Sequence, residues 1–275
     1  MAITETVLEM HYHRPMMDLI RSTYGLGTNG HFNFYKYSPQ REVFLGFDQA
    51  FAVTQYTDEQ FFSLLKQSAL TSGYKLPSKF LAYFLQYKVV TELNNRRAKT
   101  PISIKSKPHY RVTLDTTKKD RTGFSQHELL HRLSQNDGAL VYYACPMIFD
   151  KADLYEVDAS LDTLQLVDMA SCPGSFGDNS KHYIYFDQKN AQPVWCSEPV
   201  DGKSISAKSF AELVLAQLQQ REPAQSSERV TSLLTTIKEL ETQPSTERKS
   251  ESMGLSLVSD SMTIVQFVPT TDGGA

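Results

Sequence analysis

The apolar run at residues 80–90 (FLAYFLQYKVV) constrains the fold more than any other segment of this chain. It is rich in aromatic residues and is apolar at both alternating sets of positions. A strand of this kind is buried on both faces, because helices cover both sides of its sheet. The sequence therefore predicts a central strand in a layered α/β fold.

The rest of the first 150 residues alternates between helix and strand patterns. Pro15 fits the first position of a helix that ends by Gly25, and Ser125 fits an N-cap. The resulting order of elements predicts a mixed central sheet flanked by helices. The predicted strands are 31–37, 42–53, 80–90 and 139–146, and a further helix starts after Thr57.

The second half of the chain has a looser pattern. We predict strands at 164–169 and 182–186, and two amphipathic helices separated by Pro223. The second helix carries a narrow apolar stripe that either packs on its own domain or docks a partner helix. Residues 243–253 have linker composition, and 255–258 and 262–268 are expected to form a late hairpin. The expected division is a core at 1–150, an accessory part with a helical extension at 151–242, and a linker and tail at 243–275.

Composition excludes several classes of protein. The three cysteines are far apart and form no CxxC pair, so neither a disulfide framework nor a zinc site is expected. No window resembles a membrane helix, and the first ten residues do not resemble a secretory signal. We expect a cytoplasmic protein that does not enter a membrane.

Charge is unevenly distributed along the chain. The net charge is −3, yet residues 96–121 contain nine basic residues against two acidic ones. This pattern favours one local phosphate-binding surface, and the alternative is a solvated lysine-rich loop. The residues expected to contact nucleic acid are Arg96, Arg97, Lys99, Lys105 and Lys107.

Polar residues inside the central strand are the main candidates for chemistry. Gln86 and Lys88 are two positions apart, so their side chains leave the same face. Burying a lysine on such a strand is costly unless the lysine is paired or functional. The same holds for the carboxylate of Asp48 on an earlier predicted strand. An aspartate can hold a divalent ion and a lysine can serve the water or phosphate in phosphodiester cleavage. The competing interpretation is a structural Asp–Lys ion pair.

The order of elements, with Asp48 on one strand and Gln86-Tyr87-Lys88 on the next, resembles the PD-(D/E)xK restriction-endonuclease superfamily. More narrowly, it is similar to the QxK branch of Mrr-type enzymes and of bacterial anti-phage effectors, including Lamassu-type ones. The resemblance covers residues 9–146 and implies a restriction-endonuclease-like core. It implies Mg²⁺ or Mn²⁺ bound by Asp48 and Gln86, and Lys88 acting at the attacking water.

The resemblance also implies one more catalytic glutamate. Glu42 precedes Asp48 in a Glu-x-x-x-Gly-x-Asp arrangement and is the preferred candidate, with Glu9 as the alternative. Fully extended, a strand separates positions six apart by about 20 Å, so Glu42 needs a bend near Gly46 to reach the metal.

Three further polar residues lie on the helix that follows the basic segment. Gln126, His127 and His131 are weaker candidates, because related nucleases use this helix to touch nucleic acid. The two histidines are four positions apart, and we expect surface histidines rather than a metal site.

With these features, the resemblance implies an α/β endonuclease that cleaves DNA as an effector of bacterial anti-phage or anti-plasmid defence. The resemblance implies an oligomer restrained by other defence subunits, among them an SMC-like ATPase. This chain contains no P-loop, so any energy-driven activity would have to come from a partner. The rival prediction is a non-catalytic assembly or sensor subunit that keeps a nuclease-like fold. Exposure of the C-terminal apolar stripe would favour the rival.

Overall fold

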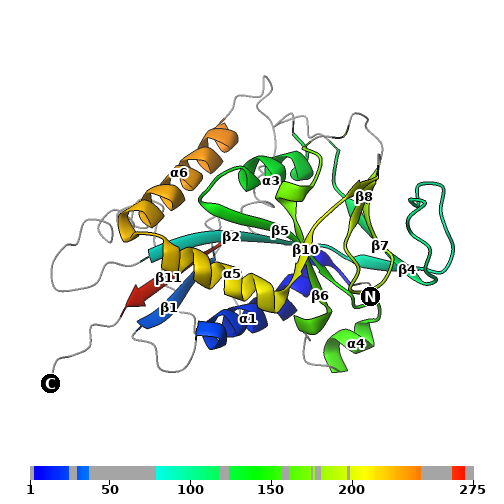
Figure 1. Cartoon of the computed structure of the whole chain (residues 1–275), viewed down its shortest axis with the longest axis horizontal. Helices are drawn as coiled ribbons and strands as arrows, with labels where there is room; N and C mark the ends of the chain where they lie inside the picture. Colours follow the sequence, from blue (N-terminus) through cyan, green and yellow to red (C-terminus); the bar gives the residue numbers. More distant parts are fainter. Residues whose placement is uncertain are drawn as a thin grey trace.

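A computed structural model defines the fold over most of the chain (Figure 1). The residues it describes are 3–24, 30–36, 79–117, 124–156, 161–174, 176, 181–196, 199–242 and 262–269. Glu42 and Asp48 lie outside the described residues. So do the predicted strand 42–53, the helix after Thr57 and the linker 243–253.

The larger of two sheets in the described part of the chain has six strands in the order β1-β11-β2-β5-β6-β10. Its strands β2 and β5 are parallel, and the other neighbours are antiparallel. A parallel pair needs a crossover connection, and the connection here contains a helix, α3 (Gln126–Ser134). The strands are β1 (Gly30–Lys36), β2 (Lys79–Tyr87), β5 (Ala139–Pro146), β6 (Leu164–Asp168), β10 (Ser204–Ser206) and β11 (Met262–Pro269).

Strand β2 is buried along both faces, as its sequence predicts. Phe80 and Phe84 belong to one apolar cluster, and Leu81 and Tyr83 belong to a second cluster across the sheet. This alternation follows from the two-residue repeat of a strand. The sheet is therefore the middle layer between two cores.

Helices cover both faces of this sheet (Figure 1). The first cluster includes apolar side chains of α3 (Gln126–Ser134) and α6 (Pro223–Thr242). The second includes those of α1 (Glu5–Tyr24) and α5 (Ala207–Gln220). The predicted α/β class, with a mixed sheet flanked by helices, is confirmed. The short α4 (Lys151–Glu156), η1 (Leu161–Thr163) and η2 (Met169–Ser171) complete the described helices.

A second, antiparallel sheet continues from the end of β2. Its strand order is β3-β4-β7-β8-β9. The chain enters it directly after Lys88 and Val89, so these residues lie at the junction of the two sheets. The strands are β3 (Val90–Leu93), β4 (His109–Leu114), β7 (His182–Phe186), β8 (Val194–Cys196) and β9 (Val200–Asp201).

Two elements differ from the sequence predictions. Helix α1 begins at Glu5, so Pro15 is inside it rather than at its start. The side chains of Leu8, Tyr12 and Met16 are buried at four-residue spacing across the proline, and this packing compensates for the hydrogen bond that a proline removes.

The predicted late hairpin is wrong in its pairing. Strand β11 pairs with β1 along one edge and with β2 along the other, so both of its edges are occupied. Part of the segment expected to be a tail is therefore an interior strand of the main sheet. Pairings between such distant segments leave no local trace in the sequence.

Candidate active site

Four polar side chains meet where β2 ends. Gln86 is the next-to-last residue of β2, and Lys88 is the first residue after the strand. Gln126 is the first residue of α3, and Glu5 is the first residue of α1. Two helix N-termini and one strand end therefore converge on a single place.

These four side chains form a closed ring of hydrogen bonds. Lys88 Nζ donates to Glu5 Oε1 at 2.9 Å and to Gln126 Oε1 at 2.9 Å. The amide of Gln126 donates to Gln86 Oε1 at 3.2 Å, and the amide of Gln86 donates to Glu5 Oε2 at 3.4 Å. Each amide is oriented by its neighbours, so the ring fixes all four groups at once.

The electrostatics of the ring depend on Glu5. The Lys88 side chain is 4 % exposed, whereas that of Glu5 is 43 % exposed. A buried ammonium is costly without a partner, and two helix N-termini nearby repel it further. The Glu5 carboxylate offsets both effects and is also favoured at the start of its own helix. The result is a buried cation whose counter-charge is a partly exposed carboxylate.

Neighbouring structure holds the ring in place. Ser125 and Glu128 form a complete capping box around the start of α3, which fixes Gln126. The backbone N–H of Lys88 donates to the Ala144 carbonyl on β5 at 2.9 Å. The ammonium of Lys88 also lies 5.8 Å from the centre of the Tyr143 ring. The lysine is thus fixed by its backbone and by its side chain.

The sequence predicted only some of the residues in this cluster. The structure joins Gln86, Lys88 and Gln126, which the sequence indicated, to Glu5, which it did not. The preferred acid, Glu42, lies outside the described residues. Its alternative, Glu9, is one turn along α1 from Glu5. Burial is the main cause that raises the pKa of the Tyr87 phenol, and the negative charge of nearby Glu9 raises it further.

A signal for Glu5 was present in the sequence. Thr4 precedes it, and Thr4 Oγ1 accepts from the Val7 backbone N–H at 3.4 Å, as at a helix N-cap. Extending the apolar stripe of α1 back to Leu8 would have placed Glu5 in the first helical turn.

The described part of the site supplies oxygen ligands but too few acids for a metal site of its own. Among the described residues, no group of three or more His, Cys, Asp or Glu side chains could hold a metal ion. Glu5 offers a carboxylate, and Gln86 and Gln126 offer amide oxygens, which suit a hard cation such as Mg²⁺. A divalent-metal site here would need a second carboxylate, and Asp48, the sequence candidate, lies outside the described residues.

The two histidines of α3 are not both surface residues, which corrects the sequence prediction for His127. Its Nε2 donates to the Pro173 carbonyl at 3.1 Å, so its Nδ1 accepts from the Tyr143 hydroxyl at 3.1 Å. Burial lowers the pKa of His127 to about 4. Both His127 and the partly buried His131 contact the thiol of Cys172 at 3.6 Å. The structure thus assigns His127 to the core as a neutral ring.

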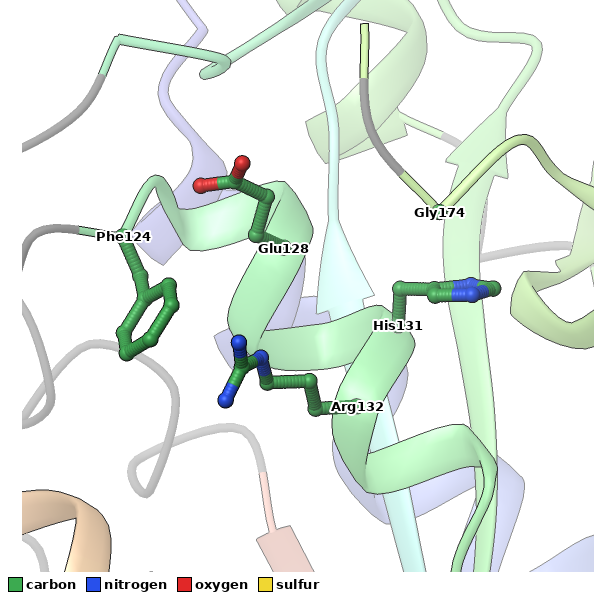
Figure 2. A pocket seen from close by; sticks show the side chains of 5 residues that line it. All are labelled: Phe124, Glu128, His131, Arg132 and Gly174. Atoms are coloured by element: carbon green, nitrogen blue, oxygen red, sulfur yellow. The ribbon is translucent and has the colours of Figure 1, made fainter.

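A hollow of about 360 Å³ lies on the outer face of α3. Figure 2 shows His131 directed toward Gly174, while the guanidinium of Arg132 lies against the ring of Phe124. At 3.6 residues per turn these side chains leave the helix opposite Gln126. The hollow is therefore separate from the ring around Lys88.

The basic residues gather on the loop between β3 and β4, which extends beyond the second sheet (Figure 1). Arg97, Lys105 and Lys107 have exposed side chains. Arg96 donates to the carbonyls of three residues of the same loop, and Lys99 Nζ donates to the Lys181 carbonyl at 3.0 Å. Arg96 therefore organises the loop. Lys118, Lys119 and Arg121 lie outside the described residues.

Comparison of the chain with protein-family models, with curated proteins and with solved structures gives no match. Among the helices that the structure describes, none combines the length and the apolar character that crossing a membrane requires.

Proposed function

We propose that this protein is a metal-dependent nuclease that cleaves phosphodiester bonds in DNA, with Lys88 at its centre. The observation that carries the proposal is the buried Lys88 ammonium held between the Glu5 carboxylate and Gln126. A protein rarely places a lysine in this environment for stability, since apolar side chains of similar volume serve as well. A fixed cation beside an exposed carboxylate suits a reaction that develops negative charge.

The ring assigns a separate task to each side chain. Lys88 polarises the attacking water or steadies the charge on the phosphate. Glu5 holds the lysine in place and, being the more exposed partner, can also accept a proton or ligate an ion. Gln86 and Gln126 orient both groups through their amides.

The chemistry of the oxygen donors favours Mg²⁺ or Mn²⁺. Glu5, Gln86 and Asp48 are the residues that would hold the ion, and Asp48 is included on the sequence resemblance alone. When bound, such an ion polarises the phosphate and lowers the pKa of water. Glu5 replaces Glu42 as the third acid in this proposal, because Glu5 contacts Lys88 directly.

Exposure of the C-terminal apolar stripe would favour the rival assignment, a non-catalytic assembly or sensor subunit. That stripe faces the protein's own core: Val230, Leu233, Leu234 and Ile237 of α6 are all buried. Helix α6 packs on β2 within the main apolar cluster. The described face of this helix therefore offers no apolar surface to a partner.

The sequence resemblance extends the proposal to a biological setting. We place the nuclease in the cytoplasm as an effector of bacterial defence, in an oligomer with other subunits that restrain it, an SMC-like ATPase among them. Restraint is physically reasonable because an unrestrained nuclease would cut the DNA of its host.

Plasmid cleavage tests this function. The purified chain is incubated with supercoiled plasmid in Mg²⁺, Mn²⁺ or EDTA, with and without the proteins encoded beside it. Nicked or linear product that requires the metal supports the proposal. If no cleavage occurs under any of these conditions, the protein is not a nuclease. Full-rate cleavage by the chain alone would disprove the restraint but not the activity.

A further inference from the structure

The loop at residues 94–108 carries an exposed isoleucine in a strongly basic setting. Ile102 is 85 % exposed, more than any other large apolar side chain among the described residues. The loop sequence, NNRRAKTPISIKSKP, contains five basic residues and no acidic one. A lone apolar side chain on a surface is ordinary, but one surrounded by cations on a projecting loop suits a polyanionic partner.

The backbone around Ile102 is held by an internal network. Residues 101–104 form a turn in which the Ile104 N–H donates to the Pro101 carbonyl at 3.1 Å, and Ile102 lies at its apex. The Arg96 guanidinium donates to the carbonyls of Thr100, Pro101 and Ile104 at 2.8–3.2 Å. The Arg96 side chain therefore stabilises the turn through three hydrogen bonds.

The loop is also fixed to the second sheet. Asp187 Oδ1 accepts from the backbone N–H groups of Ser106 and Lys105, and these bonds lower the pKa of its carboxyl. The side chain of Ile104 is buried against Leu93 and Tyr185. Ile104 anchors the loop, whereas Ile102, two residues away, points out of it.

We propose that this loop is a DNA-binding wedge: Ile102 inserts between base pairs from the minor groove while Arg97, Lys105 and Lys107 bind the flanking phosphates. The stiff, β-branched side chain of Ile102 suits insertion, and apolar wedges flanked by cations unstack and bend duplexes in this way. A membrane is the less favoured partner, because anchoring there requires a larger apolar face than one isoleucine.

The position of the loop relative to Lys88 agrees with this assignment. Strand β3 starts two residues after Lys88 and leads directly into the loop. Its four residues span about 13 Å. The loop therefore follows the proposed catalytic lysine along the chain after one short strand. This inference rests on the proposed function for its choice of DNA.

The test measures binding without cleavage. The full chain is titrated in EDTA against a 30-base-pair duplex containing 2-aminopurine, and affinity and fluorescence are followed over a range of salt concentrations. Ile102→Ala is expected to weaken binding about tenfold and to abolish the fluorescence rise that reports unstacking, while the salt dependence stays unchanged. The double variant Lys105→Ala/Lys107→Ala is expected to lower the slope of log affinity against log salt by about 2.

Two further comparisons make the result decisive. Val200→Ala is the matched control, because Val200 is 39 % exposed on β9, at the opposite edge of the second sheet from β3. It is expected to bind duplex as the wild type does. Unchanged binding and fluorescence in Ile102→Ala would overturn the wedge, as would Ile102-dependent binding to phosphatidylserine vesicles in place of duplex. Duplex binding with unstacking but no plasmid cleavage would support the wedge and reject the nuclease.

Discussion

Lys88 Nζ lies 2.9 Å from Glu5 Oε1, and this ion pair joins the end of the central strand to the first turn of α1 across 83 residues. The two partners are unequal, since the lysine is buried and the glutamate is half exposed. Removing one partner is therefore expected to have a different effect from removing the other.

Lys88→Met is predicted to leave the fold intact, whereas Glu5→Gln is predicted to destabilise it. Methionine replaces a buried cation with an apolar group of similar length, and such exchanges are often neutral. Glu5→Gln leaves the Lys88 ammonium buried without a counter-charge, which is expected to cost about 1–3 kcal/mol of unfolding free energy after allowance for the exposure of Glu5. Urea unfolding of both variants and of the double variant measures the difference. A larger loss for Lys88→Met than for Glu5→Gln would contradict this account of the pair.

If Glu5 is the third acid, variants of Glu5, Glu9 and Glu42 are predicted to differ in cleavage rate. Glu5→Gln is expected to reduce cleavage by about 100-fold or more, as expected for loss of a positioned acid or base. Glu9→Gln and Glu42→Gln are expected to stay within a few-fold of wild type. Initial cleavage rates at saturating Mg²⁺, with the folded fraction of each variant checked by circular dichroism, separate the candidates. If Glu42→Gln is the inactive variant, the assignment of Glu5 fails.

Arg96 is predicted to stabilise the loop locally rather than the whole fold. Arg96→Ala removes three hydrogen bonds to loop carbonyls, so the bonded amides of Thr100 and Ile104 should exchange about tenfold faster or more. Arg96→Lys should not rescue them, because one ammonium lacks the fork of a guanidinium. Hydrogen exchange read by mass spectrometry tests this, with neighbouring Arg97→Ala as the control. Equal effects in Arg96→Ala and Arg97→Ala would argue against an organising role.

Because His127 is buried as a neutral ring, the free energy of unfolding is predicted to fall in mild acid. The ring's folded pKa of about 4 lies below the ordinary value of about 6.5, so the unfolded chain binds a proton more readily. The stability that depends on the neutral ring is complete above about pH 6.5 and declines by about 3 kcal/mol as the pH falls to 4. Urea midpoints between pH 4 and 8 measure it. In His127→Gln this component should be absent, and an unchanged pH profile in that variant would refute the assignment.

The sequence predicted local features well and distant pairings poorly. The segments 139–146 and 182–186 form strands with the predicted bounds, because their apolar pattern is locally complete. The N-cap at Ser125 follows equally from its own neighbourhood. Strand β11 was assigned to the wrong partner, because the choice between a nearby and a distant strand depends on tertiary packing.

The candidate site shows the same division. Gln86 and Lys88 stood out because polar residues interrupt an apolar strand, and that signal is local. Glu5 did not, because its role arises only when α1 packs against the end of β2. Pro15 also obscures the true start of α1, since proline is typical of a first helical position although the buried stripe continues past it to Leu8.

Plasmid cleavage by Lys88→Met measures whether Lys88 performs chemistry. Lys79→Met is the matched control: Lys79 is at the other end of the same strand and its ammonium donates to the Gln219 carbonyl near the surface. We expect that Lys88→Met folds with near wild-type stability and loses cleavage by about 100- to 1,000-fold, as expected for loss of a charge-stabilising group, while Lys79→Met cleaves normally. Normal cleavage by a folded Lys88→Met would contradict a chemical role for Lys88.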